Sequence, residues 1–175
     1  AGDMDPALSQ IPANAQFVVL IRSLGALQAK VSNRAVQLQL PAPADLIGTF
    51  APSIGISKGI DLNGSAALVK IAPATPAPGE DAAPHSSSFL LLIPTTDPKA
   101  LLQNFKPSDP VDGISTVTIP NQSNAGYVAV STDGKYVIME DNKASLASYL
   151  AAVKAKPIAA ALPSDAIGLL DQNDL

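Results

Sequence analysis

Gly55, Ser57 and Gly59 follow the Gly-x-Ser-x-Gly pattern of a serine hydrolase nucleophile. In that chemistry a strand leads into the serine and a helix follows directly, which exposes the hydroxyl beside a histidine base. Here the residues after Gly59 have turn chemistry, and the sole histidine, His85, lies in a segment of Pro, Ala and Ser. We therefore interpret the pattern as a turn punctuated by glycines.

Asp61, Asn63 and Gly64 resemble part of a calcium loop, in which alternating side-chain oxygens surround the ion. A complete loop needs a bidentate Glu six residues after the glycine, and this chain has Lys70 there. An ordinary Asn-Gly turn accounts for the same residues. His85 alone, in a Pro-rich segment, is a poor metal ligand.

Two Thr-x-x-Lys pairs superficially resemble a nucleophile with its lysine base. Thr96 and Lys99 stand at an expected helix start, whereas Thr132 and Lys135 stand at an expected hairpin tip. The sequence also lacks a glycine-rich phosphate loop. We therefore predict no catalytic, cofactor-binding or metal-ligating residue, no cofactor, and a protein that is not an enzyme.

The composition narrows the classes of partner. A net charge of −4, a pI near 4.7 and dispersed Lys and Arg residues argue against nucleic acid, which requires clustered cations. The absence of cysteine excludes thiol nucleophiles and thiolate metal sites. No apolar run reaches the roughly 18 residues of a membrane-spanning helix. Low charge with many Ser, Thr, Asn and Pro residues favours a location outside the cytosol.

One local pattern organises the chain: a strand, a helix cap and then a helix. The apolar run 89–93 suits a strand buried on both faces, and Asp97 before Pro98 is a typical helix start. The pattern recurs at 17–21 with Ser23 as the cap, and before Asp141, which aligns with Asp97 without a gap. We expect strands 17–21 and 89–93 to be central and adjacent.

Reading the whole chain predicts the order β-α-β-β-α-β-β-β-α. This order indicates an α+β fold with a mainly antiparallel sheet of about six strands and three helices packed on one face. After Ser23, apolar residues follow helical spacing, and a further short helix is plausible at 44–50. Strand 113–119 alternates in polarity and should lie towards an edge.

We expect a single domain over residues 8–156. Residues 73–88 contain no large apolar side chain and predict a solvated loop with polyproline character. Residues 157–175 read as a linker or the truncated start of a second copy, because Leu162-Pro163 repeats the spacing of Ile11-Pro12. Ala1 is compatible with a removed signal peptide or with a cleaved expression tag.

These motifs together resemble a family of uncharacterised exported bacterial proteins with internally duplicated α+β domains. The resemblance rests on the Pro-x-Asn-Ala lead-in at Pro12, strand 17–21, Gly55-Ile56-x-x-Gly59-Ile60-Asp61, and the segment from Pro94 to Leu102. It implies export and an internal repeat. None of the shared motifs is catalytic, so it implies no site residues.

Two functions follow as expectations. The first is a non-catalytic structural or binding domain of a periplasmic, cell-surface or extracellular protein, which binds a protein partner or self-associates. A strand such as 113–119 exposes few charges that would block edge pairing. The alternative is a small-molecule or glycan-binding domain, or a degenerate hydrolase, with a site between Gly55 and Asn63. That site requires a pocket lined by Tyr127, Tyr136 or Tyr149.

Overall fold

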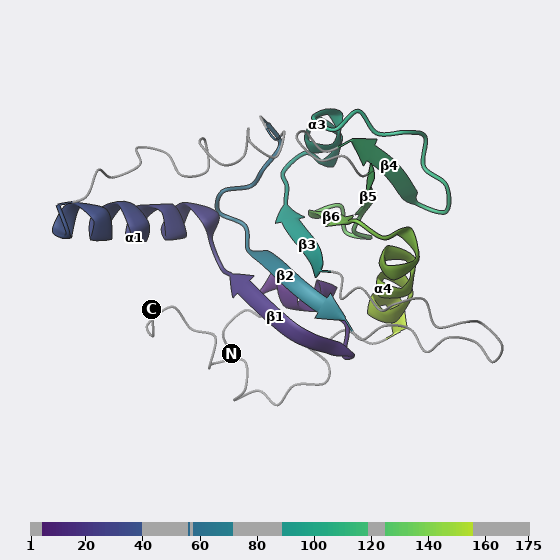
Figure 1. Ribbon diagram of the computed structural model, residues 1–175, viewed down its shortest axis with the longest axis horizontal. Coiled ribbons are helices and arrows are strands. Elements are labelled where there is room, and N and C mark those ends of the chain that lie inside the picture. The colour runs from purple at the N-terminus through teal and green to yellow at the C-terminus, as the bar shows by residue number, and fades with distance from the viewer. Residues whose placement is uncertain (1–4, 40–55, 57, 72–88, 119–124, 156–175) are drawn as a thin grey trace.

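The computed structural model describes residues 5–39, 56, 58–71, 89–118 and 125–155. These residues form ten elements, shown in Figure 1. In chain order they are η1 (Pro6–Gln10), β1 (Ala15–Ile21), α1 (Leu24–Gln37), β2 (Ala66–Ile71), β3 (Phe89–Pro94), α3 (Pro98–Gln103), β4 (Ile114–Thr118), β5 (Ala125–Val130), β6 (Tyr136–Glu140) and α4 (Lys143–Ala155).

The six strands form one antiparallel sheet in the order β1-β2-β3-β6-β5-β4. The predicted α+β class and element order are therefore confirmed. Strands β1, β2 and β3 form one meander and β4, β5 and β6 a second. The antiparallel pair of β3 and β6 joins the two meanders at the centre of the sheet.

The predicted adjacency of strands 17–21 and 89–93 is wrong, because β2 lies between β1 and β3. Strand β3 is central, as expected, but β1 is at an edge. An apolar run indicates burial on both faces only if both faces are covered. In β1 the side chains of Phe17 and Val19 remain exposed, so the apolar run 17–21 does not reflect burial of both faces of this strand.

The predicted helix caps are present, with one shift. The Ser23 side chain accepts a hydrogen bond from the Ala26 amide at 3.1 Å, and Asp97 accepts one from the Ala100 amide at 3.0 Å. At α4 the capping side chain is Asn142, not Asp141: its oxygen accepts from the Ser145 amide at 3.1 Å. Asp and Asn cap helices equally well, so the ungapped alignment could not distinguish these neighbours.

The two faces of the sheet carry separate cores, because successive side chains of a strand point to opposite faces. The first core lies under η1 and α4 and includes Leu92, Ile138 and Tyr149. The second lies under α3 and includes Ile93, Val137 and Leu101.

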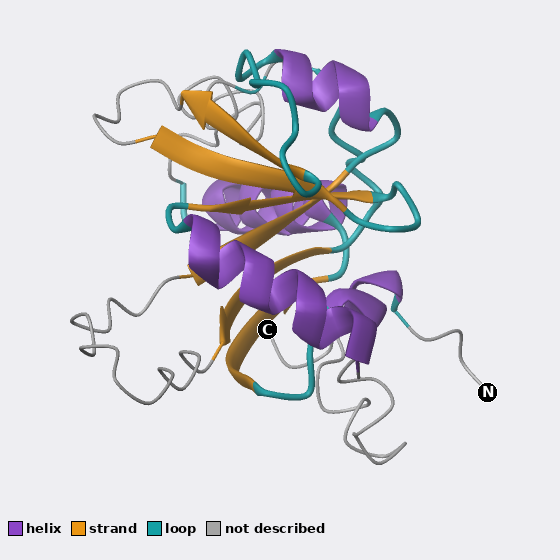
Figure 2. Cartoon of the chain, turned by 90° about the vertical axis from the view of Figure 1, so that its right-hand side faces the viewer, coloured by secondary structure: helices purple, strands orange, loops and turns teal. Residues whose placement is uncertain are grey.

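The expectation that all three helices pack on one face therefore needs correction, since α3 and α4 cover opposite faces (Figure 2). The reason is that successive side chains of β3 point to opposite faces of the sheet. Leu90 and Leu92 of β3 face α4, whereas Leu91 and Ile93 face α3. A strand that is apolar at every position can support a helix on either side.

Helix α1 is attached to the rest of the described chain near its N-terminus. The Gly25 amide donates to the Leu62 carbonyl at 2.8 Å, and the Ser23 hydroxyl donates to the same oxygen at 3.2 Å. Beyond this anchor the helix extends away from the sheet (Figure 1). Leu27 and Val31, one turn apart, remain partly exposed, so this apolar stripe is not buried against the sheet.

Several predictions fall outside the described residues: the short helix at 44–50, the loop at 73–88 and the segment 157–175. The single domain over residues 8–156 also stays a prediction.

Candidate functional site

The structure describes only part of the Gly-x-Ser-x-Gly pattern at residues 55–59. Ser57 and His85 lie outside the described residues. Gly59 has φ +90°, and a Cβ atom there would lie 2.6 Å from the Leu101 amide nitrogen of α3. This glycine is required by backbone conformation and by close packing.

Asp61 begins a tight turn. Its Oδ1 accepts the Asn63 amide at 3.0 Å, and its carbonyl accepts the Gly64 amide at 3.2 Å. A Cβ at Gly64 would lie 2.5 Å from the Pro94 Cβ, so only glycine fits. Within the described part of the chain, no three His, Cys, Asp or Glu side chains are grouped as metal ligands.

The Thr132 and Lys135 pair belongs to the predicted hairpin turn between β5 and β6. Asp133 Oδ1 accepts from the Ser131 hydroxyl at 2.6 Å and from the Lys135 amide at 3.1 Å. Gly134 has φ +70°, which suits glycine. The geometry is that of a turn with Asp133 as its internal acceptor.

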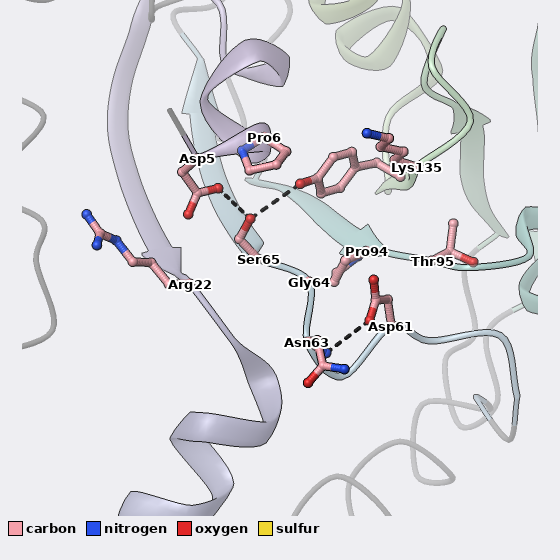
Figure 3. A pocket seen from close by; sticks show the side chains of 11 residues that line it. Asp5, Pro6, Arg22, Asp61, Asn63, Gly64, Ser65, Pro94, Thr95 and Lys135 are labelled. Carbon is pink, nitrogen blue, oxygen red and sulfur yellow. Dashed lines mark hydrogen bonds between the residues drawn. The ribbon is translucent and has the colours of Figure 1, made fainter. Parts of the chain in front are cut away.

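A polar pocket of about 460 Å³ lies beside the Asp61 turn (Figure 3). It is lined by five separate regions of the chain: the start of η1, the residue after β1, the turn before β2, the end of β3, and the β5–β6 hairpin. The lining residues are Asp5, Pro6, Arg22, Asp61, Asn63, Gly64, Ser65, Pro94, Thr95, Lys135 and Tyr136.

A chain of hydrogen bonds crosses the pocket floor. The Ser65 hydroxyl donates to Asp5 Oδ1, which can only accept, and lies 3.3 Å from the Tyr136 hydroxyl. Tyr136 must then donate to Ser65. A phenol with the ordinary pKa of 10.0 already keeps this proton at neutral pH, and burial raises the pKa of Tyr136 further. Ser65 is itself buried and already bonded twice, so it serves as a structural link, not a nucleophile.

The lining of the pocket contains equal numbers of acidic and basic side chains. Asp5 and Asp61 supply two carboxylates, while Arg22 and Lys135 supply two cations. A pocket of zero formal charge does not select one sign of ion, but it offers both donors and acceptors to a neutral polar molecule. Of the three tyrosines expected around such a site, only Tyr136 lines it.

A second feature is an apolar surface on the strands β1, β2 and β3, which we call the bare half. It lies on the sheet face that α3 covers farther along. Directly paired residues place their side chains on one face, which gives two rows. The first row is Phe17, Lys70 and Phe89, and the second is Val19, Leu68 and Leu91.

The exposure of the bare half is large for apolar side chains. Phe17 is 51% exposed, Phe89 45% and Val19 41%. The second row runs directly into the core under α3, because Leu91 pairs with Met139 and both pack against that core. Among the described residues, the bare half is thus an exposed continuation of a buried surface, and exposed apolar surfaces of this kind mark interaction sites.

The two edges of the sheet differ. At β4, the Thr116 amide donates to the Ser108 hydroxyl at 3.0 Å, and the Thr116 carbonyl accepts from the Ser108 amide at 2.9 Å. The Thr118 amide donates to the Phe105 carbonyl at 3.4 Å. The chain therefore covers the edge that the sequence suggested for self-association. Among the described strands, none lies beyond β1, so the open edge adjoins the bare half.

With this geometry in view, the chain was compared with known proteins. No family model, curated protein or solved structure is significantly similar to it. None of the described helices is both long enough and apolar enough to cross a membrane.

Sequence reasoning missed both the bare half and most of the pocket. A signal for the bare half is present in β2, where Lys70 interrupts an apolar strand between Val69 and Ile71. A cation at this position indicates a face that is not buried in the core. For the pocket, Asp5, Arg22 and Lys135 are far apart in sequence, and no spacing connects them.

Proposed function

We propose that this chain is a non-catalytic binding domain of an exported protein, which recognises a protein partner or a second copy through the bare half. The low charge and the polar, uncharged surface residues support a location in the periplasm, at the cell surface or outside the cell. The single observation that carries the proposal is the uncovered apolar surface around Phe17 and Phe89.

Physical magnitudes support binding at this surface. Each large apolar side chain contributes about 1.5–3 kcal/mol when it is fully removed from water. Phe17, Phe89 and Val19 are each about half exposed, so much of that free energy remains available to a partner. Aromatic side chains at the centre of a surface patch are typical anchors of protein interfaces.

Site-specific photo-crosslinking tests the proposal. In the full chain, Phe17 is replaced by the photoreactive amino acid benzoylphenylalanine, whose larger aromatic side chain an exposed position can accommodate. The control carries the same group at Val36, an exposed residue of α1 away from the sheet. We expect position 17 to give one defined protein adduct, either a dimer or a complex, with much less product from position 36.

The companion measurement is sedimentation velocity with the purified partner, or with the chain alone if the adduct is a dimer. Phe17→Ser with Phe89→Ser should abolish the complex, whereas Val36→Ser should preserve it. Equal crosslinking at positions 17 and 36, together with a strict monomer at millimolar concentration, would falsify the proposal.

The polar pocket favours a second candidate function, the binding of a small neutral polar molecule such as a sugar. Its support is the balanced set of donors and acceptors around Ser65. An NMR titration with a panel of mono- and disaccharides should shift the Asn63 and Ser65 amides, and Asp61→Ala should remove the effect. No shift at these amides at about 50 mM sugar, a concentration well above a weak dissociation constant, would dismiss it.

A further inference from the structure

The covered half of the sheet shows how this surface is buried elsewhere in the same molecule. Leu101 of α3 and Phe105, which lies in the turn just after the helix, are nearly inaccessible to solvent. They pack on Val117, Val128 and Val137 from β4, β5 and β6. Leu101 and Phe105 thus form an apolar pair one turn apart that closes this half of the face together with Ile56 and the partly buried Ile60.

The two halves are equivalent in strand order and direction. A pseudo-twofold axis perpendicular to the sheet, between β3 and β6, exchanges β1 with β4, β2 with β5 and β3 with β6. Such an axis keeps each face of the sheet on the same side. The position equivalent to that of α3 thus lies over the bare half, where no described helix packs.

Lys70 adds a charge requirement. It stands between Phe17 and Phe89 in one row of paired residues, and no carboxylate of the described residues pairs with it. A helix that covers this row must bring a carboxylate, or it leaves the ammonium desolvated without a partner. Helix α1 of a second copy is a poor fit, because its charged residues are Lys30 and Arg34.

We infer that the bare half binds a short amphipathic helix that presents Leu and Phe one turn apart together with an aspartate or glutamate that pairs with Lys70. This inference rests on the proposed function and names the chemistry of the partner. The apolar pair supplies the contact area and the carboxylate sets the register of the helix across the strands.

The sequence itself provides a probe. The spacing of Pro98 and Leu101 in α3 and of Phe105 just after it recurs at Pro43, Leu46 and Phe50. In each case Pro and Ser follow at the second and third positions after Phe. The second segment also carries an aspartate, at position 45. A synthetic peptide with the sequence of residues 42–54 therefore has both required features.

The protein in this experiment is the full chain with Leu46→Ser and Phe50→Ser, so that its own copy of the pattern cannot compete with the peptide. Its melting curve and NMR spectrum first establish that it is folded. We expect saturable binding, with the largest amide shifts at Phe17, Val19 and Phe89. A peptide with Leu46→Ser and Phe50→Ser is the matched control and should not bind.

A charge exchange isolates the role of Lys70. Lys70→Glu in the protein, or Asp45→Lys in the peptide, should each weaken binding about three- to fivefold, the range of a partly exposed ion pair. Combining the two changes should restore most of the affinity. A merely structural effect of Lys70→Glu would not be rescued by the exchanged peptide.

Absence of binding, or amide shifts confined to α1 or to the polar pocket, overturns this inference. Binding that is indifferent to the charge exchange also overturns it, because the carboxylate is then irrelevant. The proposed function fails separately: it is lost if benzoylphenylalanine at position 17 captures nothing. A dimer captured there without peptide binding would keep the proposed function and reject the acidic helix.

Discussion

The covered and bare halves of one sheet face offer an internal comparison. Both are three-stranded meanders with apolar side chains on the same face. One is covered by α3 and the residues around it, whereas no described helix packs on the other. Phe105, just after α3, is 1% exposed, while Phe17 in β1 is 51% exposed. Apolar side chains on this face are therefore buried and stabilise the fold in one half, while Phe17, Val19 and Phe89 in the other half remain exposed to solvent.

The largest expected effect compares two phenylalanines. Phe105→Ala should lower the free energy of unfolding by about 3–5 kcal/mol, because it leaves a cavity under α3. Phe17→Ala should cost about 1 kcal/mol or less, since the ring already contacts water. Urea denaturation of both variants measures the difference. Similar losses would mean that the bare half is buried in solution and that the comparison is invalid.

Two glycines with positive φ, Gly59 and Gly113, distinguish the cost of a steric collision from the cost of backbone strain. Gly59→Ala should cost about 2–4 kcal/mol, since the new Cβ combines a positive φ with a collision against Leu101. Gly113→Ala has a similar φ of +79° but no atom within 4 Å of its Cβ, so about 1–2 kcal/mol is expected. Thermal denaturation should rank the two variants in this order, and the reverse order would contradict the close approach of α3.

The opposite face of the sheet, on which η1 and α4 pack, serves as a reference. There the Tyr149 hydroxyl donates to the Gln10 carbonyl and joins α4 to η1. Tyr149→Phe should cost about 1–2 kcal/mol, because it leaves a buried carbonyl without its donor. Chemical denaturation at pH 7 measures this loss, with Tyr127→Phe as the control.

The same phenol predicts a pH dependence. Burial raises the pKa of Tyr149 well above its ordinary value of 10.0. The folded state then holds a proton that the unfolded state releases above pH 10, so stability should fall as the pH rises from there. The fall should be shallower in Tyr149→Phe, by up to about 1.4 kcal/mol per pH unit. Parallel curves for both proteins would contradict the burial of this hydroxyl.

The smallest effect concerns the edge of the covered half. Ser108→Ala removes the acceptor of the Thr116 amide and should cost about 0.5–1.5 kcal/mol. Hydrogen exchange should accelerate at Thr116 and remain unchanged at Val128 on the neighbouring strand. Unchanged exchange at Thr116 would show that the loop does not protect this edge.

The order of elements, the α+β class and the capped helix starts could be predicted, because each depends on local patterns of apolar residues and caps. Which parts of the sheet the helices cover could not be predicted. The runs at 17–21 and 89–93 look equally buried in the sequence, and only the placement of α3 and α4 distinguishes them. The side on which a helix packs depends on contacts that no single run contains.

The candidate sites show the same limit. The turn at Asp61 was predictable from its Asn-Gly sequence, and it does border the pocket. Arg22, Lys135 and Asp5 meet there only because strand pairing brings their segments together. The bare half is equally a product of pairing, since Phe17, Lys70 and Phe89 belong to three different strands.

The hydrogen bonds between Ser108 and Thr116 at the edge of β4 limit how copies of this chain could assemble. Among the described strands, a sheet closed at β4 offers one edge, at β1, for extension by backbone pairing. Two copies that join through that edge about a twofold axis exhaust their free strands, so growth stops at a pair instead of continuing into a filament.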